Sequence, residues 1–258
     1  MFFLPLSDDN ATIRSALIVW LVIGVCTAVL IWQHSLAPRA AEAASLTFGM
    51  IPARVFGTAQ LPPQLSLIPA WATLFTSMFL HGGWLHLLGN MWFFRIFGDN
   101  VEDSMGPGRF AVFYLAVGVT AAITQAAMGP HSPIPMIGAS GAIAGVLGAY
   151  VMLYPRANVR VLMIILLFIR VINVPAILVL GIWFALQLIG AERAPSEAGG
   201  VAFWAHVGGF LAGLVLLPLF KRNDVPLFGA AQSRAFAISG SRIGRSTGRI
   251  PTVLPRND

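Results

Sequence analysis

The stretch "GASGAIAGVLGAYVML", residues 138–153, places a serine between two glycines at the start of a long uncharged apolar segment. Gly141, Gly145 and Gly148 recur at i, i+4 and i+7, which predicts a helix with one face of small residues. Small residues let membrane helices approach closely. Ser140 is therefore either a packing residue at a helix interface or a nucleophile placed inside a membrane.

The composition indicates a polytopic membrane protein. Of the 258 residues 57% are hydrophobic and 10% are charged, whereas soluble domains carry about 25% charged residues. The net charge of +6 does not indicate nucleic-acid binding, because seven of the sixteen Lys and Arg lie in the last 38 residues. We expect 221–258 to be a disordered cytoplasmic tail beside anionic lipid. Cys26 is the only cysteine, so a cysteine metal site or intrachain disulfide is excluded, and we expect no metal or cofactor.

Six uncharged stretches have about the length of a membrane span: 15–32, 71–94, 110–128, 136–155, 171–191 and 201–220. They predict an all-α, six-helix membrane domain over 15–220, preceded by a cytoplasmic segment, 1–14. The first stretch lacks the features of a cleaved signal peptide. The run 161–169 is too short to span and is expected to be interfacial or re-entrant.

Basic residues predict the orientation of the spans. The 156–170 connection carries three arginines and no acid, and such connections lie in the cytoplasm. Together with the basic tail this places both termini in the cytoplasm and the connections 33–70, 129–138 and 192–200 outside. The long 33–70 connection is expected to be functional and to lie on the membrane surface.

Polar residues of three spans fall at one depth. Ser140 lies about 22 Å and His206 about 21 Å above the cytoplasmic ends of their spans, at about 1.5 Å per residue. Asn90 lies at a similar height, with His86 one turn higher on the same face. Polar groups at that depth face the bundle interior or a water-filled cavity, and the non-helical "SPIPMIGA" (132–139) is tolerated only there.

A second stripe of small residues matches the first. Gly209 and Gly213 share a face with His206, so packing them against Gly141 and Gly145 would bring the Ser140 and His206 side chains within hydrogen-bond reach. Each feature alone also has a structural interpretation: a packing serine, an interhelical His86–Asn90 bond, close-packed glycines. Their coincidence at one depth favours catalysis. By contrast, Asp99, Glu102 and Asp103 are expected to pair with Arg95, Arg109 or backbone groups and to brace the bundle.

The sequence resembles the rhomboid intramembrane serine proteases over about residues 70–220. The resemblance rests on "HGGWLHLLGN" (81–90), "GASGAIAG" (138–145) and "AHVGGFLAG" (205–213), in this order on six predicted spans, and "FGDNVED" (97–103) adds a bacterial character.

The resemblance implies an endopeptidase that cleaves transmembrane segments of other proteins near the extracytoplasmic face. It implies Ser140 as the nucleophile and His206 as the general base. Asn90, His86 and the Ser140 backbone N–H would form the oxyanion hole. A structural role would fall to His81, Glu102 and five glycines: Gly138, Gly141, Gly145, Gly209 and Gly213.

Two positions depart from the family pattern. A Trp-Arg pair often precedes the first His, but here Ala72 follows Trp71, which leaves the 33–70 loop without that anchor. An aromatic ring one turn after the serine often stacks on the catalytic His, but here that residue is Ala144. Phe203 or Trp204 would then have to orient His206.

Two rival functions are weaker. An inactive relative that binds membrane segments would usually have lost the serine or the histidine, and both are present. A small-solute transporter would be expected to show inverted repeats and matching broken helices, which the sequence lacks. The expected partners are transmembrane substrates and the lipid bilayer, without nucleic acid, and the expected location is a bacterial plasma membrane.

Overall fold

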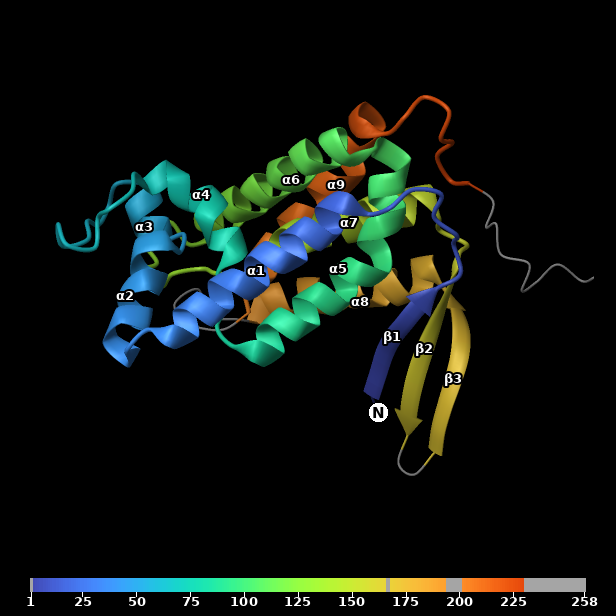
Figure 1. Cartoon of the computed structure of the whole chain (residues 1–258), viewed down its shortest axis with the longest axis horizontal. Coiled ribbons are helices and arrows are strands. Elements are labelled where there is room, and N and C mark those ends of the chain that lie inside the picture. The colour runs from blue at the N-terminus through green and yellow to red at the C-terminus, as the bar shows by residue number, and fades with distance from the viewer. Residues whose placement is uncertain (1, 166–167, 194–200, 230–258) are drawn as a thin grey trace, which may run out of the picture.

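Helix α7, Ser140–Leu153, lies at the centre of a helical bundle in the computed structural model, which describes residues 2–165, 168–193 and 201–229 (Figure 1). Every residue from Gly141 to Tyr150 is buried, which explains why this helix is apolar on all sides. Its neighbours are α5 (Trp84–Met105), α6 (Pro107–Met128) and α9 (Phe203–Phe220). The expected tail from residue 230 onward and most of the 192–200 connection lie outside the described residues.

Four described helices are long and apolar enough to cross a membrane: α1 (Leu17–Ser35), α6, α8 (Ala176–Arg193) and α9. Helix α5 has the length but carries four charged residues, and α7 has only 14 residues. The helical membrane bundle predicted from the sequence is confirmed, while the count of six spans stays a prediction.

The start predicted for the second span, at residue 71, is too early, because the helix begins only at Trp84. Residues of its first half form short turns, Ala70–Ala72, α4 (Thr73–Thr76) and Ser77–Phe79, before α5 begins at Trp84. The break falls at two adjacent glycines, and Gly83 has a φ of +154°, a conformation that L side chains rarely adopt. His86 and Asn90 therefore lie in the first two turns of α5.

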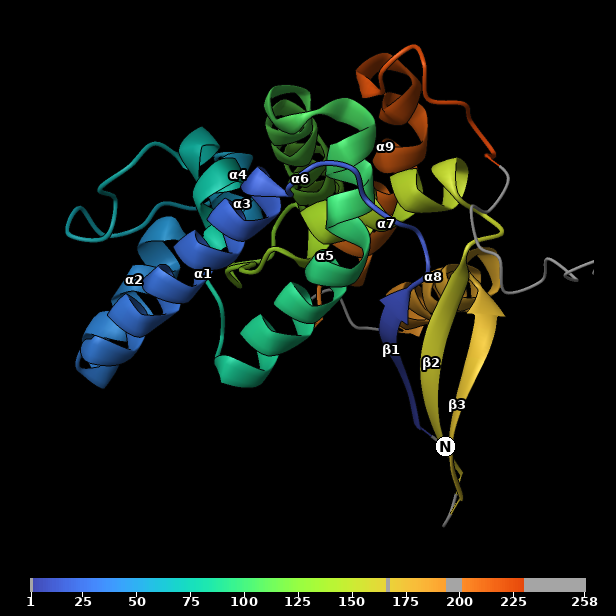
Figure 2. The ribbon, with the colours of Figure 1, turned by 45° about the vertical axis from the view of Figure 1, so that its right-hand side comes forward.

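A three-stranded antiparallel sheet lies beside the bundle, in the order β1 (Phe2–Asp8), β2 (Asn158–Ile165), β3 (Phe168–Pro175) (Figure 2). It replaces the interfacial or re-entrant run expected at 161–169, and it delays the start of α8 to Ala176, five residues after the predicted start of the fifth span. Strand β1 lies along α5, where the Trp92 Nε1–H donates to the Pro5 carbonyl at 2.6 Å.

The 33–70 connection is folded rather than extended. It contains α2 (Pro38–Phe48) and α3 (Pro52–Val55), and Met50 forms a β-bridge with Met136 in the segment before α7. Arg54 is buried and donates to the carbonyls of Thr47 and Ile68. Arg54 therefore anchors this connection, which lacks the Trp-Arg pair of the family pattern.

Glu102 connects the first helix to the bundle. Its two carboxylate oxygens accept the backbone N–H groups of Ile18 and Val19 at 2.9 Å, so it caps the N-terminus of α1. Asp99 pairs with Arg95 at 2.6 Å on the same helix. Residues 222–229, which composition assigned to the tail, pack back on the bundle, where the N–H groups of Phe228 and Gly229 donate to carbonyls of α7.

Candidate active site

Ser140 is the first residue of α7, and the backbone before it is shaped by Gly138. Gly138 has a φ of +125°, and a Cβ there would lie 2.8 Å from the His86 ring, so only glycine fits. As the first helical residue, Ser140 has a backbone N–H without an intrahelical acceptor, at the positive end of the helix dipole. The Ser140 Oγ lies 2.7 Å from the His206 Nε2.

The contact between α7 and α9 brings this serine and histidine together. A Cβ on Gly209 would lie 2.0 Å from the Gly141 carbonyl oxygen, and one on Gly213 would lie 1.9 Å from that of Gly145. The two backbones are therefore in direct contact along the two glycine stripes. His206, in the first turn of α9, is 7% exposed.

The opposite side of His206 faces α8. The Gln187 Oε1 lies 2.7 Å from the His206 Nδ1, and the Trp183 ring is tilted against the imidazole with centroids 5.8 Å apart. Phe203 meets the imidazole edge-on at 6.5 Å. The sequence suggested Phe203 but missed Trp183 and Gln187; a carboxamide one turn after an aromatic residue in an apolar span was the available signal.

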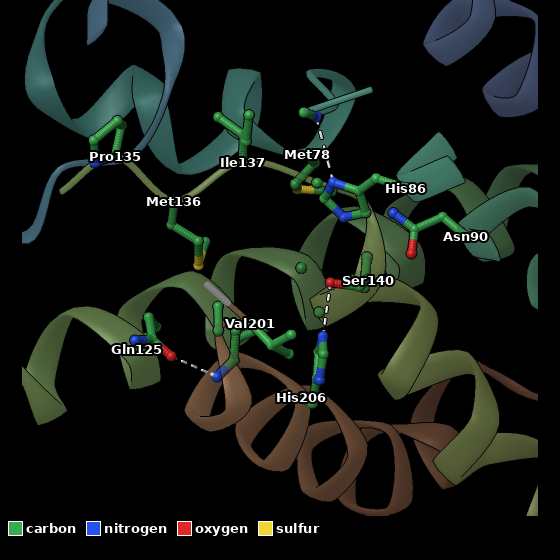
Figure 3. A pocket seen from close by; sticks show the side chains of 18 of the residues that line it. Met78, His86, Asn90, Gln125, Pro135, Met136, Ile137, Ser140, Val201 and His206 are labelled. Carbon is green, nitrogen blue, oxygen red and sulfur yellow. Dashed lines mark hydrogen bonds between the residues drawn. The ribbon is translucent and has the colours of Figure 1, made fainter. Parts of the chain in front are cut away.

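His86 and Asn90 approach Ser140 from α5 (Figure 3). The Gly82 N–H donates to the His86 Nδ1 at 3.3 Å, so in the neutral ring Nε2 carries the proton. That nitrogen lies beside Gly138, and the Asn90 Nδ2 lies 3.7 Å from where a Gly138 Cβ would be. Within the described residues the buried Asn90 Nδ2 has no hydrogen-bond partner. Two N–H donors thus converge next to the serine.

A cavity of about 450 Å³ connects these groups. Its walls come from α5, α6, the 132–138 segment, and the first turns of α7 and α9 (Figure 3). Gln125 of α6 accepts the Ala205 N–H at 3.1 Å, which fixes the start of α9 beside the cavity. The cavity is large enough to hold several water molecules.

Of the other candidate residues, Gly138 and Gly141 line the cavity, and the rest lie outside it. His81 is buried, with its ring edge-on to His86 at 5.1 Å between centroids, and Glu102 lies at the far end of α5. Gly145, Gly209 and Gly213 lie in the α7–α9 interface. Over the described ranges, no group of three or more His, Cys, Asp or Glu could hold a metal ion.

Comparisons with known proteins point to one family. A family model described as Rhomboid domain matches residues 69–223. The rhomboid protease GluP of Bacillus subtilis (strain 168) is 34% identical over 148 residues, 57% of this chain and 26% of the relative. Rhomboid-like protein 11, chloroplastic, of Arabidopsis thaliana is 27% identical over 164 residues, 60% of this chain and 54% of the relative.

A third relative is named as a mitochondrial protein. Rhomboid protein 1, mitochondrial, of Saccharomyces cerevisiae (strain ATCC 204508 / S288c) is 28% identical over 179 residues, 62% of this chain and 48% of the relative. The chain thus spans between 26% and 54% of the length of these three relatives. With the family model covering more than half of its residues, the chain is a multi-pass membrane protein that belongs to the rhomboid family.

Proposed function

We propose that the protein is an intramembrane serine endopeptidase that cleaves transmembrane segments of other proteins. The observation that carries the proposal is the 2.7 Å contact between the Ser140 Oγ and the His206 Nε2, beside a cavity lined by the Asn90 Nδ2, which has no partner within the described residues. A serine hydroxyl becomes a useful nucleophile when an adjacent base takes its proton. The name of the Bacillus relative, a protease, supports the same activity.

The reaction begins with attack of the Ser140 Oγ on the scissile carbonyl carbon, while His206 accepts the hydroxyl proton at Nε2. The oxygen that becomes negative is stabilised by the Asn90 Nδ2–H, the His86 Nε2–H and the Ser140 backbone N–H. His206 then gives its proton to the leaving amine. A water molecule in the cavity attacks the acyl-serine with His206 again acting as base, which releases the new carboxylate and restores Ser140.

The position of the site supports a proposal for the substrate class. Ser140, His206, His86 and Asn90 all lie in the first turns of their helices, so the site is near one end of the bundle. The basic 156–170 connection assigns the opposite end to the cytoplasm. Substrates would then be cut near the extracytoplasmic face, where a helix can unwind to expose its peptide bond. We place the protein in a bacterial plasma membrane with both termini cytoplasmic.

The test is fluorophosphonate labelling of the purified protein in detergent, with cleavage of a model single-span substrate measured in parallel. Wild type should be labelled and active, whereas Ser140→Ala and His206→Ala should lose both properties at unchanged thermal stability. Mass spectrometry of the products should place the cut near the extracytoplasmic end of the substrate helix. A folded wild type that neither labels nor cleaves would instead indicate a relative that binds membrane segments without cutting them.

A further inference from the structure

Gln187 stands out on α8 because the helix is otherwise apolar up to its final Glu192 and Arg193 and is little buried. Among its described residues only Ala176, Leu180 and Ala191 are buried, and α8 has the composition of a lipid-facing span. A carboxamide in such a helix is unfavourable unless its donors and acceptor are paired. Both ends of the Gln187 side chain are in fact paired, one within α8 and the other on α9.

These two bonds fix which way the amide points. The Gln187 Nε2–H donates to the Trp183 backbone carbonyl at 3.3 Å, and a carbonyl oxygen can only accept. The nitrogen must therefore face Trp183, and the oxygen must face His206. The Oε1 is a pure acceptor, so at 2.7 Å the His206 Nδ1 has to be the donor.

The protonation pattern of His206 follows from this. With the proton held on Nδ1, the neutral ring has a bare Nε2 that can accept the Ser140 hydroxyl proton. The other tautomer would point an Nε2–H at the serine and break the bond to Gln187. The Gln187 side chain therefore selects the reactive tautomer of His206. In serine proteases of other folds, a carboxylate that accepts the Nδ1–H has this role.

We propose that Gln187 is the positioning residue of the catalytic base, the third member of a Ser140–His206–Gln187 chain. The inference rests on the proposed protease function and deepens it. Gln187 contacts no substrate; it orients the imidazole and stabilises the imidazolium formed when His206 takes the serine proton. Trp183, from the same helix, restricts the ring from its face.

The arrangement makes catalysis depend on the docking of α8. Phe184 stacks on Phe210 of α9 with centroids 4.4 Å apart, and Gly190 lies against the Phe203 ring. Both contacts join the helix that carries Gln187 to the helix that carries His206. When α8 moves away from α9, His206 loses its Nδ1 acceptor.

Two substitutions separate positioning from packing. Gln187→Met keeps the length and volume of the side chain but removes the acceptor, whereas Gln187→Glu keeps an acceptor oxygen. Leu186→Met is the control, since Leu186 is a neighbour with an exposed side chain. Gln187→Met should lower kcat and the fluorophosphonate labelling rate by about ten- to a hundredfold with KM unchanged, a loss below that of a wrong catalytic tautomer elsewhere. Gln187→Glu should restore both to within about threefold, because either protonation state of a carboxyl offers an acceptor oxygen.

A readout independent of activity tests the same point. In protein labelled with ¹⁵N-histidine, the ring signals assigned by loss in His206→Ala should show the Nδ1–H tautomer in wild type and a tautomer mixture in Gln187→Met. Wild-type kcat and an unchanged tautomer in Gln187→Met would overturn the inference while leaving the protease intact. Failure of wild type to label or cleave would overturn the proposed function, and an Nδ1–H tautomer would then show Gln187 to position a non-catalytic histidine.

Discussion

At the scale of single residues, the candidate site combines a hydrogen-bonded serine and histidine with side-chain donors that line the cavity. The Asn90 Nδ2 has no partner within the described chain, and the His86 Nε2–H points into the same space next to Gly138. An unpaired buried donor costs about 1–3 kcal/mol in a folded protein. In the mechanism that we propose, the Asn90 Nδ2–H gains its acceptor, the oxyanion, only during the reaction.

If Asn90 is the oxyanion donor that we propose, Asn90→Ala should lower kcat by about 10²–10³-fold, with a smaller effect on KM, because the lost bond is strongest in the transition state. Steady-state kinetics on a model transmembrane substrate would measure this. Leu88→Ala is the matched control, since Leu88 lies on the same helix with 59% of its surface exposed. Equal losses in both variants would remove Asn90 from the oxyanion hole.

The residues of the candidate site were predictable from the sequence, but the residues that hold them in place were not. Ser140, His206, Asn90 and His86 could be found because each is a polar group at one depth of an apolar span. The contacts of Arg54 with Thr47 and of Gln187 with His206 could not be assigned, since each joins two different elements and no local spacing connects the two residues.

At the scale of elements, the glycine stripes of α7 and α9 decide how closely Ser140 and His206 approach. Their i, i+4 spacing is local, so the sequence alone indicated which faces would meet. The sheet is different: β1 pairs with β2 across about 150 residues of chain, and short apolar runs read equally well as interfacial helix. The strands therefore became visible only in the folded structure.

Gly209→Ala should separate α7 from α9, because the added Cβ would meet the Gly141 carbonyl oxygen at 2.0 Å. Overpacking of this kind costs about 1–3 kcal/mol, so we expect a lower melting temperature in detergent together with loss of fluorophosphonate labelling. Gly181→Ala on α8 is the matched control. Its Cβ meets nothing within 4 Å, and the substitution should leave stability unchanged or raise it slightly. A Gly209→Ala protein as stable and as reactive as wild type would contradict direct backbone contact.

At the scale of the whole molecule, a cluster of polar groups holds the β-sheet to the bundle. The Asp8 Oδ2 accepts the Tyr150 hydroxyl at 2.5 Å and the Asn100 Nδ2–H at 2.9 Å. Burial raises the pKa of Asp8 from 3.8 to about 7, with smaller contributions from the nearby Asp99 and Asp9. Asp99 is itself paired with Arg95. When β1 is docked on the bundle, Asp8 therefore keeps a proton that it releases when β1 is undocked.

The docking of β1 on the bundle should depend on pH. Between about pH 4 and pH 7 the docked Asp8 is protonated and the undocked Asp8 is ionised, so docking of β1 weakens as the pH rises, by up to about tenfold per pH unit. Hydrogen exchange of residues 2–8, corrected for intrinsic rates, should show protection that falls across this window. Asp8→Asn should abolish the dependence and protect the strand at pH 7. Protection that rises with pH in wild type would refute a proton held at this contact.

The pairing of the N-terminal strand also limits how the chain can be threaded through a bilayer. The Asp9 N–H donates to the Asn158 carbonyl at 3.0 Å, so these two points of the chain lie on the same side of the membrane. The number of crossings between them must then be even. Helices α1 and α6 are two such crossings by length and composition. The charged α5 and the short α7 therefore either both cross or both fail to cross, and a single backbone hydrogen bond rules out an odd number of spans between residues 9 and 158.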